Sequence, residues 1–339
     1  MNNERKMATI RTIDEIKPIE GADRICLYIV DGWQCVDQVG RFSVGETVIY
    51  CEVDSWIPHE IAPFLSKGKE PREYKGIEGE RLKTIHLKGQ ISQGLLLKPD
   101  DFLKEYTIGD DVSADVGILK WEKELSPQLR GLARGNFPTA VPKTDQERVQ
   151  NLKKQWKDYY GEYEVTEKLE GMSATYFLDT DGDFHVCSRN LDLKETEENV
   201  YWMIARKYNI EQKMRDKDLL GYAIQGEIVG PKVEGNIYGL SDIDFYVYDV
   251  YDSVAGKYLG SERRFYVANA LDLKHTPVFS HLQNVSDSTS VADILEMAEI
   301  ESALANTLAE GIVFKRLDGV KSFKAISNEY LLKGGKHKK

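Results

Sequence analysis

A lysine followed by a carboxylate and a glycine stands between two strand-like runs of this chain, in the segment Glu167-Lys168-Leu169-Glu170-Gly171. A lysine amine attacks a phosphorus atom only when it is unprotonated, and its ordinary pKa is near ~10.4, so such a site must desolvate it or surround it with positive charge. Partial burial and a bound divalent cation would do both. Gly171 would let the backbone approach a ligand. The segment suggests Lys168 as a nucleophile, although a solvated lysine beside a glutamate is the commoner reading of so short a motif.

Further candidate residues follow this motif in the same half of the chain. Arg189 offers a forked donor for ribose or phosphate oxygens. Glu227 and Glu310 each place a carboxylate on an apolar strand, where a charge is costly unless it binds something. Phe245 lies on an aromatic strand able to stack a purine, and Lys324 adds a late cation for phosphate. Each residue alone is more simply read as a core aromatic, a surface ion pair or a strand-end carboxylate, but their joint occurrence indicates nucleotidyl transfer.

With these residues the chain resembles the covalent nucleotidyltransferase superfamily, which comprises ATP-dependent DNA ligases, RNA ligases and messenger-RNA capping enzymes. It is most similar to the RNA ligases of the Deinococcus and Naegleria type, which carry an OB domain before the catalytic domain. The resemblance covers nearly the whole chain, and three longer strings, Asp31–Cys35, Gly89–Leu95 and Pro142–Asn151, are more specific than the lysine motif. The residues that fall on motifs I, Ia, III, IIIa, IV and V are Lys168, Arg189, Glu227, Phe245, Glu310 and Lys324.

This resemblance implies an ATP-dependent RNA ligase that joins 3′-hydroxyl and 5′-phosphate ends through lysyl-AMP and RNA-adenylate intermediates, in the repair of nicked duplexes. Its partners would be RNA and ATP, with Mg²⁺ or Mn²⁺ held by Glu170, Glu227 and Glu310, since these ions prefer carboxylates. The implied catalytic residues are Lys168, Glu227, Glu310 and Lys324. The implied ATP contacts are Arg148, Glu167, Glu170, Gly171, Arg189, Phe245, Ile312 and Lys315, with Ile312 or Val313 on the purine face opposite Phe245.

Two departures and the order of domains bear on this interpretation. Motif I has Glu170 where relatives often have aspartate, and motif V has Ile326 where many have a second lysine, a role that Lys315, Lys321 or Arg148 could share. DNA ligases and capping enzymes place an OB domain after motif V, but only fifteen residues (339 − 324) follow Lys324 here. The alternatives are a DNA ligase or other covalent nucleotidyltransferase, and a non-catalytic RNA-binding protein.

Composition and patterning predict an α+β chain of two domains, since 339 residues exceed the size at which one core usually stops growing. We expect an OB-fold RNA-binding barrel over residues 1–112, a linker over 113–140, and over 141–339 an ATP-grasp-like nucleotidyltransferase domain of antiparallel sheets with flanking helices. The barrel strands are expected at 25–30, 33–39, 46–53, 80–87 and 94–97, with a mobile loop at 57–79. Helices are expected at 145–157, 195–207 and 291–310.

A net charge of −11 argues against a nucleic-acid partner, because phosphate contacts need clustered cations. The charges are unevenly distributed, however, and a basic stretch from Lys67 to Lys88 could contact RNA or could simply be a solvated face. No apolar run reaches the ~20 residues that span a bilayer, so we expect an intracellular monomer without membrane contact. Four cysteines without CxxC spacing favour buried free thiols over disulfides or zinc.

Overall fold

The computed structural model describes residues 5–122 and 131–333, and its contacts divide the chain into two compact units. The first unit comprises Met1–Glu124 and Gln150–Lys154, and the second comprises Leu125–Val149 and Gln155–Lys339. The four cysteines are buried and unbridged, which confirms their expected state. Among the described residues, no helix has the length and apolarity needed to cross a membrane.

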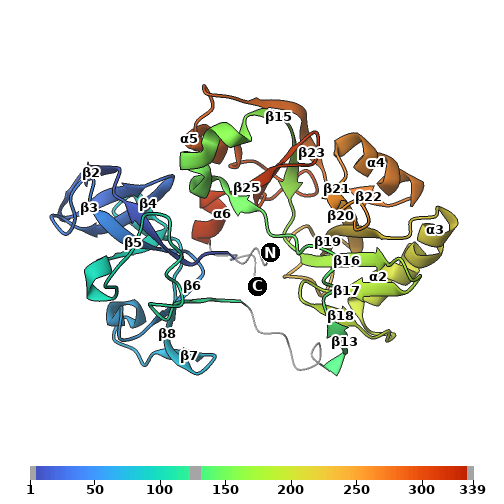
Figure 1. Cartoon of the computed structure of the whole chain (residues 1–339), viewed down its shortest axis with the longest axis horizontal. Coiled ribbons are helices and arrows are strands. Elements are labelled where there is room, and N and C mark those ends of the chain that lie inside the picture. The colour runs from blue at the N-terminus through green and yellow to red at the C-terminus, as the bar shows by residue number, and fades with distance from the viewer. Residues whose placement is uncertain (1–4, 123–130, 334–339) are drawn as a thin grey trace. The chain divides into compact units, whose positions relative to one another are not determined.

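The first unit is built almost entirely of short antiparallel strands (Figure 1). One three-stranded sheet has the order β1-β5-β11, a second has the order β2-β3-β4, and two apolar clusters fill the unit. The strands of these sheets are β1 (Ala8–Thr12), β2 (Glu15–Ile19), β3 (Ala22–Val30), β4 (Trp33–Gln38), β5 (Thr47–Glu52) and β11 (Gly94–Leu97). The other elements are β6 (Ser55–Pro58), β7 (Arg72–Tyr74), β8 (Ile77–Arg81), β9 (Ile85–Leu87), β10 (Gln90–Ser92), β12 (Leu119–Lys120) and the 3₁₀ helices η1 (Pro63–Ser66) and η2 (Pro99–Asp101).

The segment expected to be a mobile loop is more ordered than its composition indicated. Residues 57–79 hold η1 and most of a hairpin between β7 and β8. Lys75 and Gly76 turn this hairpin with positive φ angles of 51° and 79°, and Tyr74 packs on Trp56 with ring centroids 5.3 Å apart. Strand β12, inside the expected linker, pairs with β6. Aromatic packing and strand pairing therefore order segments that are rich in charge and glycine.

The second unit contains two larger sheets (Figure 1). An eight-stranded sheet runs in the order β13-β18-β17-β16-β19-β20-β21, with β22 on β20, and a five-stranded sheet has the order β14-β25-β24-β15-β23. The strands of the first sheet are β13 (Ala133–Asn136), β16 (Met172–Leu178), β17 (Phe184–Cys187), β18 (Leu191–Leu193), β19 (Tyr222–Val229), β20 (Asp244–Asp252), β21 (Lys257–Tyr258) and β22 (Lys274–His275). The strands of the second are β14 (Glu147–Arg148), β15 (Gly161–Lys168), β23 (Val278–Val285), β24 (Gly311–Arg316) and β25 (Ser322–Ile326).

Helices are shorter than the sequence pattern predicted. In place of the helix expected at 145–157, the chain has β14 and then the 3₁₀ helix η3 (Val149–Tyr159), broken at Gln155. The second predicted helix begins only at Val200, because Asn199 caps it by accepting a hydrogen bond from the Tyr201 amide. The third ends at Met297, and residues 298–309 form an irregular loop. The helices are α2 (Val200–Lys207), α3 (Ile210–Asp216), α4 (Ser261–Ala270), α5 (Val291–Met297) and α6 (Asn328–Lys333).

Candidate active site

Lys168 is the last residue of β15, a central strand of the five-stranded sheet. The strand forms because Tyr163 and Val165 are buried apolar residues at alternate positions. Three residues after Lys168, Gly171 packs directly on β19: a Cβ atom there would lie 2.3 Å from the Ile228 carbonyl oxygen. Gly171 is therefore needed for contact between the two sheets of this unit, and this contact brings the lysine motif to the strand that carries Glu227.

Strand register decides which predicted residues share the face of the sheet with Lys168. Lys168 pairs with Gly311 and Thr166 with Val313, while Val313 pairs with Lys324 and Lys324 with Arg148. Directly paired residues lie on one face, and side chains alternate along each strand. Lys168, Val313, Lys324 and Arg148 therefore share a face.

The same register places Ile312 and Glu167, which pair with each other, on the opposite face. Of the two residues considered for the second purine face, Val313 lies on the side of Lys168 and Ile312 does not.

Carboxylates, and not cations, are the nearest charged neighbours of Lys168. Its ammonium nitrogen lies 2.6 Å from Oε2 of Glu310. Burial lowers the pKa of Lys168, and Arg148 lowers it as well. The carboxylates of Glu310 and Glu227 together raise it by more, so the pKa stands above its ordinary value. These carboxylates thus favour the ammonium form, and a neutral amine requires that their charge be offset.

Glu227 and Glu170 complete the set of carboxylates expected to bind a metal. Burial raises the pKa of Glu227 to about 8, although Lys168 lowers it. Burial also raises the pKa of Glu170, whose Oε2 atom is buried without a hydrogen-bond partner among the described residues. The backbone amide of Glu170 donates to the hydroxyl of Tyr238 over 2.7 Å.

These carboxylates are not gathered into a preformed metal cage. Within residues 5–122 and 131–333, no three acidic, histidine or cysteine side chains have an arrangement that could hold an ion. Mg²⁺ and Mn²⁺ prefer hard oxygen donors, and Mg²⁺ usually keeps several waters while binding only one or two carboxylates. The unpartnered oxygen of Glu170 and the two carboxylates beside Lys168 fit such water-bridged binding.

Arg189 and Lys324 converge on one carboxylate. A guanidinium nitrogen of Arg189 lies 3.0 Å from one oxygen of Asp145, and the Lys324 ammonium lies 3.1 Å from the other. Motifs Ia and V, which are far apart in the sequence, therefore present cations to a common anion. A phosphate group could take the position of this carboxylate.

Phe245, which was expected to stack on a purine, faces the hydrophobic core. Its side chain is fully buried and meets the Tyr176 ring edge-on at a centroid distance of 5.1 Å. Its ring also covers Gly226, since a Cβ atom there would lie 2.4 Å from it. The reason is register: Glu227 pairs with Tyr246, so Phe245 and Glu227 point to opposite faces of the sheet.

Tyr248 is the aromatic residue that sequence reasoning missed. The register of β20 against β19 shifts between Gln225 and Gly226, which is the mark of a β-bulge. The Tyr248 hydroxyl lies 2.7 Å from that of Ser173, the residue that pairs with Glu227. Tyr248 is thus on the Glu227 face and half-buried. Its place in the aromatic string was visible, but the bulge that turns it to this face was not.

Lys315, expected to contact the cofactor, is engaged in a buried charge network. Its ammonium lies 2.5 Å from Asp249 and donates to the Tyr248 carbonyl, and burial lowers its pKa to about 8. Its partner across the strands, Glu164, accepts from the guanidinium of Arg264 in α4. Both members of this second pair are almost fully buried. The network joins strand β15 to strand β20 and fixes the carbonyl of Tyr248.

We predict that Arg264→Met lowers the free energy of unfolding by about 3–5 kcal/mol, because it leaves the Glu164 carboxylate buried without its partner. Chemical denaturation measures this change. The double variant Glu164→Leu/Arg264→Met should recover most of the loss, since an apolar pair of similar volume carries no unpaired charge. If Arg264→Met is as stable as the unmodified protein, the ion pair between Glu164 and Arg264 does not stabilise the fold.

Glu167 is buried beside the loop that follows α5. One of its oxygens accepts from the Ala303 amide over 2.9 Å, and the other, Oε1, is buried with no hydrogen-bond partner in the described part of the chain. Burial raises its pKa, although Ser302 and Ala303 oppose this. An unsatisfied buried oxygen is unfavourable, so this atom is suited to accept a hydrogen bond from a ligand.

Comparison with known proteins supports the assignment of the fold and identifies the family. The profile of the RNA ligase family matches residues 161–326, and that of an OB-fold domain matches residues 7–99. The comparison with curated proteins gave no match.

Solved structures of an RNA ligase from Naegleria gruberi are similar to nearly the whole chain. The structure with PPi is 42% identical, with a TM-score of 0.90, and the alignment covers 97% of this chain and 98% of that one. A variant with ATP and Mn is also 42% identical, with a TM-score of 0.89 and coverage of 96% and 98%. A variant with AMP and Mn is 42% identical, with a TM-score of 0.90, and the alignment covers 96% of this chain and 98% of that one.

Proposed function

This chain belongs to the RNA ligase family, and on that premise we propose that it seals RNA ends at the expense of ATP through a covalent AMP adduct on Lys168. The amine would attack the α-phosphorus of ATP and release pyrophosphate, forming a nitrogen–phosphorus bond. AMP would then pass to the 5′-phosphate of RNA, and a 3′-hydroxyl would displace it. The observation that carries the proposal is the 2.6 Å contact of Lys168 with Glu310, which places a lysine amine against a carboxylate of motif IV.

Protein groups would control the charge of the nucleophile in the first step. Glu227, Glu310 and Glu170 would bind Mg²⁺ or Mn²⁺ through direct or water-bridged contacts, and the charge of the ion would offset the carboxylates and favour neutral Lys168. Arg148 also lowers the pKa of Lys168 and so opposes its protonation. In-line transfer of a nucleotidyl group depends mainly on such positioning and neutralisation.

Three cations would bind the ATP phosphates. Arg189 and Lys324 both contact the Asp145 carboxylate. Arg148 is the partner of Lys324 in the pairing of β14 with β25. Ile326, which replaces the second lysine of motif V, is buried and cannot supply charge. We propose that Arg148 takes over that charge.

Lys315 and Lys321 are less suited to this role. Lys315 is buried against Asp249, and the Lys321 ammonium lies over the Tyr159 ring, 4.8 Å from its centroid.

We propose that the purine binds between Tyr248 and Val313 and that its edge lies at the end of β15. There Glu167, although its side chain leaves the opposite face of the sheet, would accept a hydrogen bond from the adenine edge or the ribose. Tyr248 lies on the Glu227 face and Val313 on the Lys168 face, so both belong to the surfaces that carry the chemistry. The unpartnered oxygen of Glu167 supports its part in this arrangement.

Tyr248→Ala is predicted to raise the KM for ATP in adenylation by roughly 10- to 100-fold, because loss of one base-stacking ring removes ~1–3 kcal/mol. Phe245→Leu is the control, because Phe245 is an aromatic residue of the same strand that faces the core. It should lower stability by opening space in the core while leaving the KM within about threefold. Initial rates of AMP labelling across ATP concentrations test both variants. A larger increase in KM for Phe245→Leu than for Tyr248→Ala would show that Phe245 stacks on the purine.

The proposed function is tested by incubation with α-labelled ATP and Mg²⁺ or Mn²⁺, followed by nicked duplexes that carry ribose or deoxyribose at the 3′-hydroxyl. Covalent labelling of the protein and sealing that requires ribose are the expected results. Labelling with sealing of both ends would favour a ligase of broader specificity, and absence of labelling would reject the mechanism.

A further inference from the structure

A short two-stranded ribbon extends from the first unit, formed by β9 and β10 (residues 85–92) and named here the β9–β10 ribbon. Lys88 and Gly89 turn it with φ angles of 47° and 80°, as a two-residue hairpin turn requires. Every residue of β9 is exposed, including Ile85 at 44% and Leu87 at 37% of their accessible surface. β10 packs against β4, whereas β9 is the outer strand of the ribbon, so the apolar side chains of Ile85 and Leu87 are left in water.

The base of the ribbon is firmly held, although its tip is not. Ser92 accepts a hydrogen bond from the Val36 amide over 3.0 Å, and the Gln93 amide donates to the Gln34 carbonyl over 2.7 Å. At Gly94 a Cβ atom would lie 2.4 Å from the Tyr50 ring. Packing therefore accounts for the second half of the Gly89–Leu95 string. It does not account for the exposed residues of β9, which add nothing to the core.

Charge distinguishes the ribbon from the rest of this acidic chain. No aspartate or glutamate occurs from Arg81 to Lys98. Within the described residues, Lys83, His86 and Lys88 are exposed and make no ion pair or hydrogen bond through their side chains. Other cations of the expected basic stretch are engaged, for instance Arg72 with Glu80 and Arg81 with Asp54. Lys67 and Lys69 of that stretch are exposed as well, but Glu70 follows them directly, whereas the ribbon and Lys83 lie within the segment that has no acidic residue.

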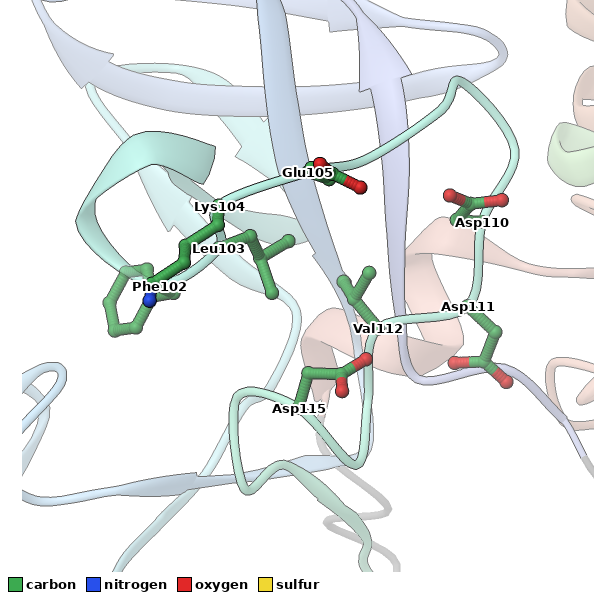
Figure 2. A pocket seen from close by; sticks show the side chains of 8 residues that line it. All are labelled: Phe102, Leu103, Lys104, Glu105, Asp110, Asp111, Val112 and Asp115. Atoms are coloured by element: carbon green, nitrogen blue, oxygen red, sulfur yellow. The ribbon is translucent and has the colours of Figure 1, made fainter.

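A different part of the first unit is strongly acidic. A cavity of about 520 Å³ is lined by Glu105, Asp110, Asp111 and Asp115, and Lys104 is its one basic lining residue. Figure 2 shows these side chains, with Lys104 beside Phe102 at one side of the cavity. None of the motif residues lines it. A polyanion would be repelled here and attracted at the ribbon, so the unit offers RNA a defined place to bind.

We propose that the β9–β10 ribbon is an RNA-binding arm of the first unit, in which Lys83 and Lys88 contact phosphates while Ile85 and Leu87 contact ribose and base surfaces. Cations beside exposed apolar side chains fit a single strand or the shallow groove of an RNA duplex, which offers phosphates and sugar edges. The inference rests on the proposed function, because that function makes RNA the substrate that the arm would hold.

The test compares the affinity of the full-length protein for a fluorescent nicked RNA duplex, by anisotropy across salt concentrations. Lys83→Ala/Lys88→Ala should weaken binding roughly tenfold at moderate salt and lessen the slope of log K against log salt by about 2. Lys17→Ala/Lys104→Ala makes the same change of charge elsewhere in the unit and should have little effect. Equal losses in the two double variants would overturn the proposal, as would no loss in the first.

Two further measurements separate the parts of the proposal. Ile85→Ser/Leu87→Ser should weaken binding while leaving the salt slope unchanged, because it removes apolar contact and no charge. AMP labelling without RNA should be unchanged in all three double variants, since the ribbon carries no residue of the proposed site. Failed labelling by the unmodified protein would reject the proposed function, whereas normal labelling with unaltered RNA binding in the ribbon variants would reject only the arm.

Discussion

Replacement of Lys168 by methionine is expected to abolish covalent labelling of the protein by ATP. Methionine preserves the length of the side chain but has no amine, so no bond to the α-phosphorus can form. The loss should exceed 10³-fold and reach the detection limit, because the other lysine of this face, Lys324, is paired with Asp145 and does not lie against Glu310. Gel analysis of the acid-stable adduct after incubation with α-labelled ATP measures it.

The structure offers suitable controls for this variant. Lys257→Met removes an exposed lysine of β21 and should label normally. Thermal unfolding of Lys168→Met should show a folded protein, since the side chain ends in a contact with Glu310 and not in an apolar core. An acid-stable AMP adduct on Lys168→Met would show that another residue is the nucleophile.

Lys168 and Glu310, which the sequence assigns to one site, do lie in contact where two adjacent strands end and begin. Strand β15 ends at Lys168, and strand β24 begins at Gly311, which pairs with Lys168. Glu310 directly precedes Gly311 and therefore meets Lys168. Glu227 stood out because a carboxylate within an apolar strand indicates a ligand. Local composition was therefore enough to identify these residues.

The direction of side chains could not be obtained in the same way. Phe245 and Tyr248 both belong to one aromatic string, and their faces depend on the pairing of β20 with β19 and on a bulge in that pairing. Ile312 and Val313 likewise differ only in register. Shifting a strand by one residue reverses its faces, and register depends on contacts that are distant in the sequence.

The first unit illustrates the same limit. The OB-fold domain that the comparisons identify was expected from its short strands and turns, but the expected strand over 80–87 is in fact two elements, the end of β8 and the exposed β9. A run that alternates apolar and basic residues satisfies the strand pattern whether or not its apolar side is covered. Exposure of Ile85 and Leu87 could be learned only from the structure.

Glu310→Gln is expected to reduce the rate of AMP labelling by roughly 100-fold or more, and this variant separates two roles of the carboxylate. Glu310 raises the pKa of Lys168, so its replacement by the neutral amide should lower that pKa and increase the neutral amine at a given pH. If protonation of Lys168 alone limited the reaction, labelling would become faster and its pH profile would move to lower pH. If Glu310 instead holds the divalent cation, the loss of several kcal/mol of charge stabilisation should outweigh that gain.

The measurement is the initial rate of labelling as a function of pH and of Mg²⁺ concentration. The control is Glu162→Gln, which changes an exposed carboxylate of β15, the strand that carries Lys168. We expect a slower rate at every pH and a higher Mg²⁺ requirement for Glu310→Gln, with neither change in the control. A faster rate at neutral pH with an unchanged Mg²⁺ titration would mean that Glu310 only restrains the nucleophile. Because the carboxylate touches Lys168 directly, the two roles predict opposite signs, and one pH series decides between them.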